Sequence, residues 1–201
     1  ALLDQAGVPV PDGDVVTTVE AAQRMARRLR GPVVLKPLDA NQGKGVTVDC
    51  TTPDDVARAF EFARQYGRRI IVERHVKGRD YRVLVAGGRV AAASRRRPAH
   101  VVGDGVKTIR ELVEIENADP ARGAGHATIL TRIALDDHAA DMLSRQGFEF
   151  DSVLPVGVVA ELRGNANLST GGTAEDVTDL LPDSTRLLCV RAAAKIGLDV
   201  A

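Results

Sequence analysis

Two lysines and a loop that contains glycines form the first group of residues that could bind a ligand. Lys36 lies in the apolar run PVVLKPL, and the loop DANQGKG follows it directly. Glycines let backbone N–H groups approach phosphate oxygens, and two ammonium groups suit a polyphosphate. The loop runs into a strand and lacks the GxxxxGKS or GxxxxGKT pattern, so it matches neither usual nucleotide motif. An ordinary hairpin loop with a solvent-facing lysine is the alternative. The residues of interest in the loop are Asn41, Gly43, Lys44 and Gly45.

A charged segment that ends a predicted strand forms the second group. It consists of Glu73, Arg74, His75 and Val76, with Asp80 seven residues after the glutamate. The end of a strand offers backbone donors and acceptors to the edge of an adenine ring, and a later carboxylate can accept hydrogen bonds from ribose hydroxyls. In the alternative interpretation, the two carboxylates pair with nearby arginines on the surface.

A polar loop near the carboxyl end forms the third group. Arg163 and Asn165 precede the segment NLSTGG (167–172). Arginine offers a planar fork to a phosphate or a carboxylate, and asparagine offers an amide donor and a carbonyl acceptor. An ordinary turn-rich loop is the alternative, because asparagine and glycine are common in turns.

The elements that must position these residues follow from capping signals and apolar patterns. Helices are predicted from Thr17 to Gly31, from Thr52 to Gly67, over 108–117, over 136–146 and over 184–195. Strands are predicted over 32–38, 46–49, 69–76 and 158–163, with a hairpin around Gly87 and Gly88. The segments 8–13, 98–107, 119–131 and 164–176 are predicted to be loops.

Composition excludes several classes of protein. The 201 residues carry 27 Lys and Arg against 27 Asp and Glu, and only 3% are aromatic, which argues against a nucleic-acid binder. No apolar run reaches the roughly 18 residues that a membrane helix needs. Two isolated cysteines and the lack of a visible signal segment favour the cytoplasm.

The three groups, taken in this order, resemble the ATP-grasp family of carboxylate–amine ligases. The matching stretches cover essentially the whole chain. Within the family, the NANLSTGG loop favours the cyanophycin synthetase branch, while the VVGDG and TIRELV stretch is also similar to the ATP-grasp half of bifunctional glutathione synthetases. The stretches are VVLKPLDANQGKGVTV (33–48), IVERHVKGRDYRVLVAGGRVAAASRRRPAHVVGDG (71–105) and LRGNANLSTGGTAEDVTD (162–179).

The resemblance implies an α+β ATP-grasp fold, incomplete at the C-terminus, with ATP held between two subdomains. Residues 1–76 would form the central subdomain with the phosphate loop. Residues 77–201 would form the C-terminal subdomain, in which 103–150 would be a helical insertion or lid.

The same resemblance implies a role for each group. Lys36 would contact the α- and β-phosphates, and the loop with Lys44 would close over the β- and γ-phosphates. Glu73 to Val76 would form the adenine hinge, mostly through backbone atoms, and Asp80 would bind the ribose. The residues expected near the γ-phosphate and the activated carboxylate are Arg82, Arg97, Arg163 and Asn165.

Magnesium is also implied, but its ligands are not identified. Family members hold Mg²⁺ with an acidic residue shortly after a GLDVAGVD-like stretch and with a Glu-x-Asn pair. This chain stops at GLDVA (197–201) and does not begin with Met, so we expect it to be a piece of a longer ligase. Without those carboxylates, the isolated chain is expected to bind nucleotide weakly and to turn over poorly or not at all.

The implied reaction is phosphoryl transfer to a carboxylate, which gives an acylphosphate that an amine attacks. The protein supplies positive charge and positioning. In the cyanophycin branch, this region would add aspartate to an Asp/Arg polymer, and a separate Mur-ligase-like domain would add arginine. A glutathione synthetase-type ligase and a non-catalytic nucleotide-binding module remain as alternatives. The oligomeric state stays open, and a homo-oligomer is compatible with the sequence.

Overall fold

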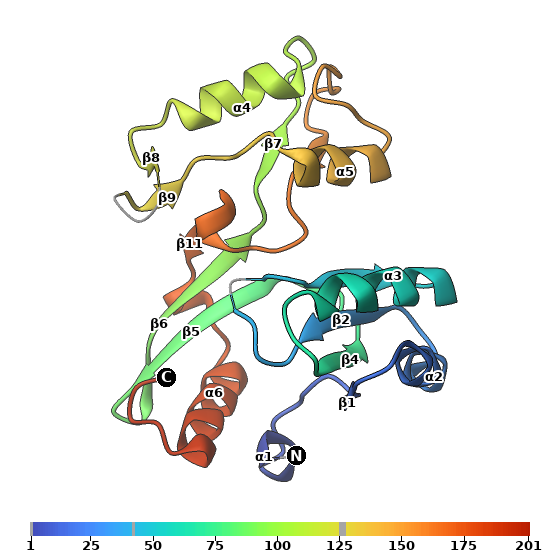
Figure 1. The fold of residues 1–201 in the computed structure, drawn as a ribbon. Helices are drawn as coiled ribbons and strands as arrows, with labels where there is room; N and C mark the ends of the chain where they lie inside the picture. Colours follow the sequence, from blue (N-terminus) through green and yellow to red (C-terminus); the bar gives the residue numbers. More distant parts are fainter. Residues whose placement is uncertain (1, 42, 125–127) are drawn as a thin grey trace. The chain divides into compact units, whose positions relative to one another are not determined.

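The computed structural model describes residues 2–41, 43–124 and 128–201, and Figure 1 shows the chain as a ribbon. The chain divides into two compact units, residues 1–78 and 79–201. The helices are α1 (Leu2–Gln5), α2 (Val19–Leu29), α3 (Pro53–Arg64), α4 (Ile109–Asn117), α5 (Asp137–Arg145) and α6 (Asp183–Ile196), with 3₁₀ turns η1 (Leu168–Thr170) and η2 (Thr178–Leu180). The strands are β1 (Gly13–Val16), β2 (Val33–Pro37), β3 (Thr47–Cys50), β4 (Ile70–Arg74), β5 (Asp80–Ala86), β6 (Arg89–Arg97), β7 (His100–Val102), β8 (Arg122–Gly123), β9 (Leu130–Thr131), β10 (Val159–Glu161) and β11 (Thr173–Asp176).

The first unit is an antiparallel sheet with the strand order β1-β4-β2-β3, covered by α2 and α3. Side chains alternate between the two faces of a strand, and alternate residues of β2 and β4 are buried. Leu35, Ile70 and Val72 pack with Phe60 of α3 and Met25 of α2 in one core. The other face of the sheet therefore carries the half-buried residues of these strands.

Capping residues set the starts of both helices in this unit. Thr52 accepts a hydrogen bond from the Asp55 N–H, and Asp55 accepts one from the Thr52 N–H, which confirms the predicted cap at Thr52. The predicted cap at Thr17 is wrong by one residue, because Thr18 accepts from the Ala21 N–H. Arg30, with φ of 53°, takes the left-handed position that ends α2.

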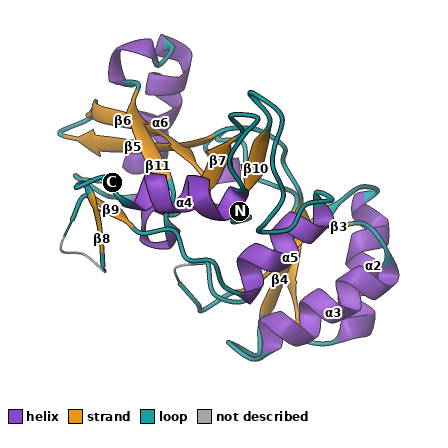
Figure 2. Cartoon of the chain, turned by 90° about the horizontal axis from the view of Figure 1, so that it is seen from above, coloured by secondary structure: helices purple, strands orange, loops and turns teal. Residues whose placement is uncertain are grey.

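The second unit contains a sheet of order β11-β6-β5 and two smaller strand pairs, β10-β7 and β8-β9. Figure 2 shows β11, β6 and β5 side by side, with α6 next to them. The predicted hairpin is confirmed, because β5 and β6 pair antiparallel around Gly87 and Gly88, both with positive φ. A separate core around Leu143, Leu154 and Ile109 joins α4 and α5 to β7 and β10.

Four segments that the sequence predicts to be loops contain short strands. Gly13 begins β1, and β7, β8 with β9, and β11 lie in the other three. Three of these strands, β1, β7 and β11, pair with strands that are not their neighbours in the chain, for example β11 with β6. β8 and β9 form a short parallel pair with each other. Local composition carries no signal for pairing with a distant strand. A prediction from sequence therefore follows the turn-forming residues of these segments and assigns them to loops.

None of the helices in the described ranges is long and apolar enough to cross a membrane.

Candidate functional site

Lys36 and Glu73 meet on the face of the first sheet that α2 and α3 leave uncovered. Their strands are neighbours, with Val34 of β2 opposite Glu73 of β4, so Lys36 lies one step further along the same face. The Lys36 Nζ is 2.6 Å from the Glu73 Oε1, and the two side chains are 35% and 18% exposed. Glu73 thus pairs with the predicted phosphate-binding lysine and not with an arginine.

The loop after β2 folds back on itself through glycines. Gly43 and Gly45 have φ angles of 78° and 69°, which residues other than glycine rarely adopt. The Lys44 N–H donates to the Asn41 carbonyl over 3.1 Å, while the Lys44 side chain is exposed. Gln42, which lies inside the predicted phosphate loop, is outside the described residues. The loop therefore presents one lysine to solvent beside a tightly turned backbone.

The predicted adenine hinge has its N–H groups partly engaged. The Arg74 N–H donates to the Asp12 carbonyl over 2.8 Å, and the His75 N–H donates to the Pro32 carbonyl over 2.9 Å. Proline has no N–H, so Pro32 cannot return a hydrogen bond to the His75 carbonyl. The side chains are paired locally as well, Arg74 with Asp12 at 3.5 Å and the His75 Nδ1 with Asp49 at 3.2 Å. The segment can therefore offer a ligand backbone groups, such as the His75 carbonyl.

In the second unit, the sheet register places Asp80 and Arg82 on one face. Asp80 is opposite Arg96, and Arg82 is opposite Ser94, so these four side chains share a face. The Arg82 Nε lies 3.9 Å from the Asp80 Oδ1, and both side chains are solvent-exposed. A cavity of about 460 Å³ is lined by Arg82, Ser94 and Arg96 together with apolar residues of β5 and β6.

Arg97 lies on the opposite face of the same sheet. It is opposite Thr173 of β11, and its neighbour Arg95 is two residues away on the same side of β6. No hydrogen bond or ion pair of the Arg97 side chain occurs within the part of the chain that the structure describes. The register thus separates Arg82 from Arg97, and their common role at a γ-phosphate stays a prediction.

Arg163 and Asn165 are both engaged in local structure. Arg163 is 7% exposed, its Nη2 lies 2.8 Å from the Asp136 Oδ2, and its Nη1 donates to the Leu162 carbonyl. Asp136 also caps α5, so the buried arginine anchors that helix. The Asn165 Oδ1 accepts from the Thr170 hydroxyl at 3.1 Å and from the Asn167 N–H, which shapes the NANLSTGG loop. Whether either residue touches a ligand stays a prediction.

Arg122 and Arg95 are buried or half-buried cations that the sequence did not single out. Arg122 is 3% exposed, and its Nη1 donates to the carbonyls of Thr131 and Gly171, each at 3.0 Å. It therefore ties the NANLSTGG loop to β9 across a long stretch of chain. No sequence signal distinguishes this arginine from its neighbours, because its partners are distant in the chain.

A metal site is not formed by the described residues. Residues 2–41, 43–124 and 128–201 contain no group of three or more His, Cys, Asp or Glu side chains placed to hold an ion. None of these described residues is therefore assigned to Mg²⁺.

Comparison with known proteins identifies the fold as that of the ATP-grasp ligases, as the sequence predicted. A bifunctional glutathione synthetase from Pasteurella multocida superimposes with a TM-score of 0.62 and 35% identity, covering 99% of this chain and 27% of that one. An ATP-grasp ligase complexed with a minimal precursor, Mg and ADP superimposes with a TM-score of 0.50 and 17% identity, covering 99% of this chain and 41% of that one. At this identity, the comparison supports the fold alone. The chain belongs to the family described as D-ala D-ala ligase C-terminus, whose model matches residues 2–112.

The full chain is also similar to cyanophycin synthetase. The enzyme from Trichormus variabilis is 46% identical over 201 residues, which is 100% of this chain and 22% of that protein. This identity confirms the branch predicted from the NANLSTGG loop. The chain spans about a fifth of the length of the curated relatives that it matches.

Proposed function

We propose that this chain is the ATP-binding part of a carboxylate–amine ligase that adds aspartate to cyanophycin, the Asp/Arg polymer. The observation that carries the proposal is the 46% identity to a cyanophycin synthetase over all 201 residues. ATP supplies a γ-phosphoryl group that converts a carboxylate into an acylphosphate, and the amine of the next building block then displaces phosphate. The residues of the chain provide charge and position.

The open face of the first sheet suits the nucleotide. Glu73 holds the Lys36 ammonium at 2.6 Å on that face, where it can meet the α- and β-phosphates. The exposed Lys44 and the glycine loop close over the outer phosphates. The His75 carbonyl accepts a hydrogen bond from the adenine amino group, and Pro32, which accepts from the His75 N–H, has no N–H to compete for that carbonyl.

In the second unit, we assign Asp80 to the ribose hydroxyls and Arg82 to the transferred phosphoryl group. Arg97 and Asn165 are assigned to the carboxylate being activated. Arg163 acts from its buried position by holding Asp136 and the Leu162 carbonyl, just before the NANLSTGG loop, so it is a positioning residue. Charge-assisted hydrogen bonds from guanidinium groups suit both phosphate and carboxylate oxygens.

The remaining parts of the proposal concern the longer protein. Phosphoryl transfer of this class uses Mg²⁺ with ATP, and no described residue is assigned to hold it. The partners are aspartate and the growing polymer, with a Mur-ligase-like domain that adds arginine. Because the reaction consumes ATP, we place it in the cytoplasm.

A glutathione synthetase-type ligase is the second candidate. It is favoured by the 35% identity and the TM-score of 0.62 to the enzyme from Pasteurella multocida. Substrates separate the two candidates in the full-length protein. If the first candidate is correct, the full-length protein should release ADP when it is given aspartate and an Asp/Arg primer. If the second is correct, it should release ADP with γ-glutamylcysteine and glycine.

The phosphate site is tested by replacing both of its lysines. The double variant Lys36→Ala and Lys44→Ala should bind ATP at least about tenfold more weakly, because each lost charge-assisted contact is worth about 1.5–3 kcal/mol. Titration calorimetry with ATP provides the measurement, and Lys195→Ala on α6 is the matched control. Equal ATP affinity in the double variant and in the parent chain would remove the assignment of this site.

A further inference from the structure

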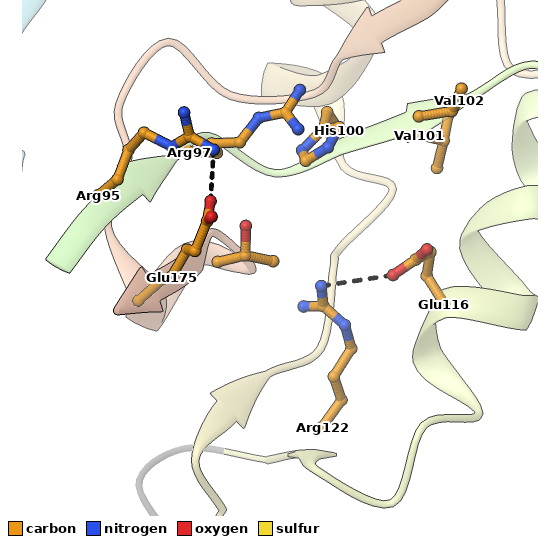
Figure 3. A pocket seen from close by; sticks show the side chains of 10 residues that line it. Arg95, Arg97, His100, Val101, Val102, Glu116, Arg122 and Glu175 are labelled. Carbon is orange, nitrogen blue, oxygen red and sulfur yellow. Dashed lines mark hydrogen bonds and ion pairs between the residues drawn. The ribbon is translucent and has the colours of Figure 1, made fainter. Parts of the chain in front are cut away.

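Arg122, at the start of β8, is a buried cation to which none of the roles proposed above is assigned. Its side chain is 3% exposed. Its Nη1 donates to the Thr131 carbonyl of β9 and to the Gly171 carbonyl, each over 3.0 Å. Its Nη2 lies 3.5 Å from the Glu116 Oε2, and Figure 3 shows the two side chains pointing toward one another from β8 and α4. One guanidinium group therefore connects β9, the last turn of α4 and the NANLSTGG loop (165–172).

Hydrogen bonds within the NANLSTGG loop make it a compact unit. The Thr170 hydroxyl lies 3.1 Å from the Asn165 Oδ1 and 3.0 Å from the Asn167 carbonyl. The Asn167 carbonyl also accepts from the Gly172 N–H over 3.0 Å. Because these bonds run from one end of the loop to the other, an anchor at Gly171 orients Asn165 as well.

The anchored end of the loop lies in close contact with backbone on two sides. A Cβ atom built at Gly171 would lie 2.9 Å from the Ile133 Cγ1, and one built at Gly172 would lie 2.8 Å from the Arg97 carbonyl oxygen. Ile133 is itself fixed to α4, because its N–H donates to the Asn117 Oδ1 over 2.8 Å and its carbonyl accepts from the Asn117 Nδ2 over 2.9 Å. Arg122 thus closes a framework that holds the loop against the segment after β9 and the end of β6.

Stability alone is a poor reason for a charged group at this position. The cost of removing a guanidinium group from water offsets much of the attraction in a buried ion pair. Glu116 is half exposed, so solvent weakens its attraction to Arg122 further. An apolar side chain could fill the same space, but it could not donate to two carbonyls from one planar group. The contribution that only the arginine makes is the position of the loop.

We propose that Arg122 is a positioning residue for the carboxylate that is activated, and that it acts by holding the Gly171 carbonyl and thereby the orientation of Asn165. This inference rests on the proposed ligase function, in which Asn165 contacts that carboxylate. Arg122 itself is assigned no contact with a substrate. A displacement of about 1 Å in a group that orients a reactant can cost about a hundredfold in rate.

Steady-state kinetics of the full-length protein separate positioning from stability. Arg122→Met removes the donors to both carbonyls, so the KM for the Asp/Arg primer, which brings the carboxylate, should rise about tenfold or more. The KM for ATP should stay unchanged, because the residues assigned to ATP lie on other segments. Arg122→Lys keeps one charged donor and should give an intermediate KM for the primer. A purely structural role would reduce the amount of active enzyme, and thus kcat, without changing either KM.

Two further variants serve as controls. Arg110→Met removes another arginine of the second unit, which pairs with Asp151 at 3.1 Å and not with the loop, so both KM values should match those of the parent. Glu116→Gln removes the acidic partner of Arg122 and keeps its bonds to the two carbonyls, so the KM for the primer should stay close to that of the parent. Thermal unfolding followed by circular dichroism verifies that each variant is folded.

Hydrogen exchange of the chain tests the anchor without any turnover. Peptides that cover residues 165–172 should exchange faster in Arg122→Met than in the parent, because the loop loses its bond to β8. The same peptides should exchange at the parent rate in Arg110→Met.

Unchanged exchange of the loop in Arg122→Met would overturn the proposal. An unchanged KM for the primer, or an equal rise of the KM for ATP, would overturn it as well. A parent protein that releases no ADP with the primer would contradict the ligase function and the role of Arg122 together. Turnover by the parent with an unaffected KM for the primer in Arg122→Met would contradict the role of Arg122 alone.

Discussion

Gly45 shows how closely a single backbone position is constrained at the candidate phosphate loop. It is buried, its φ is 69°, and a Cβ atom built there would lie 2.7 Å from the Tyr66 ring and 2.9 Å from the Pro37 Cγ. Only a residue without a side chain fits, so the loop returns tightly against the end of β2. The position of Lys44 depends on this return.

Gly45→Ala should therefore lower both stability and ATP affinity. The positive φ and the crowding together should cost about 1–3 kcal/mol of folding free energy. Urea denaturation and ATP titration measure the two effects. Gly31→Ala is the matched control, because nothing lies within 4 Å of a Cβ at that position and its φ is not positive. If Gly45→Ala behaved like Gly31→Ala in both measurements, the loop would not depend on this close contact.

At the scale of elements, α3 illustrates how a cap fixes the start of a helix. Asp55 accepts hydrogen bonds from the Thr52 N–H and hydroxyl and from Thr51, and these bonds lower its pKa from 3.8 to about 2. Because the pKa is lower in the folded state, the charged cap stabilises the fold above pH 4. This contribution is lost as the pH falls from about 4 to about 2.

Asp55→Asn should destabilise the chain at pH 7 by about 0.5–1 kcal/mol, within the range of helix caps after allowance for solvent exposure. The difference from the parent chain should shrink as the pH falls from 4 toward 2. Urea midpoints at a series of pH values measure it. Asp54→Asn lies in the same turn and serves as the control. A difference that stays constant down to pH 2 would show that the Asp55 charge does not contribute.

At the scale of the whole molecule, the hydrophobic residues form separate cores. Phe60 is fully buried in the core of the first unit, and Leu143 is fully buried in that of the second. Each unit therefore has its own source of hydrophobic stability.

Scanning calorimetry should consequently show that core substitutions act on one unit at a time. Phe60→Ala and Leu143→Ala should each cost about 2–5 kcal/mol. Each should lower one component of the unfolding transition and leave the other in place. A single transition that both substitutions lower equally would mean that the two cores unfold as one.

The sequence alone determined the elements whose signals are local. The cap at Thr52, the capping box at Thr108, the Gly-Gly hairpin and the apolar run around Lys36 each act within a few residues, and the structure contains the helix starts, the hairpin and the strand that they predict. The amino-acid sequence of the NANLSTGG loop also predicted the branch of the family correctly. Short-range sterics and hydrogen bonding suffice for such features.

Only the tertiary structure decided which distant side chains share a face. Lys36 and Glu73 are 37 residues apart and meet because β2 and β4 pair. Arg82 and Arg97 lie on opposite faces because one register step reverses every side chain of a strand. Arg163 and Arg122 are buried by partners 27 and 49 residues away, Asp136 and Gly171. The sequence determines that an arginine is charged, but the packing of distant segments determines which groups it contacts.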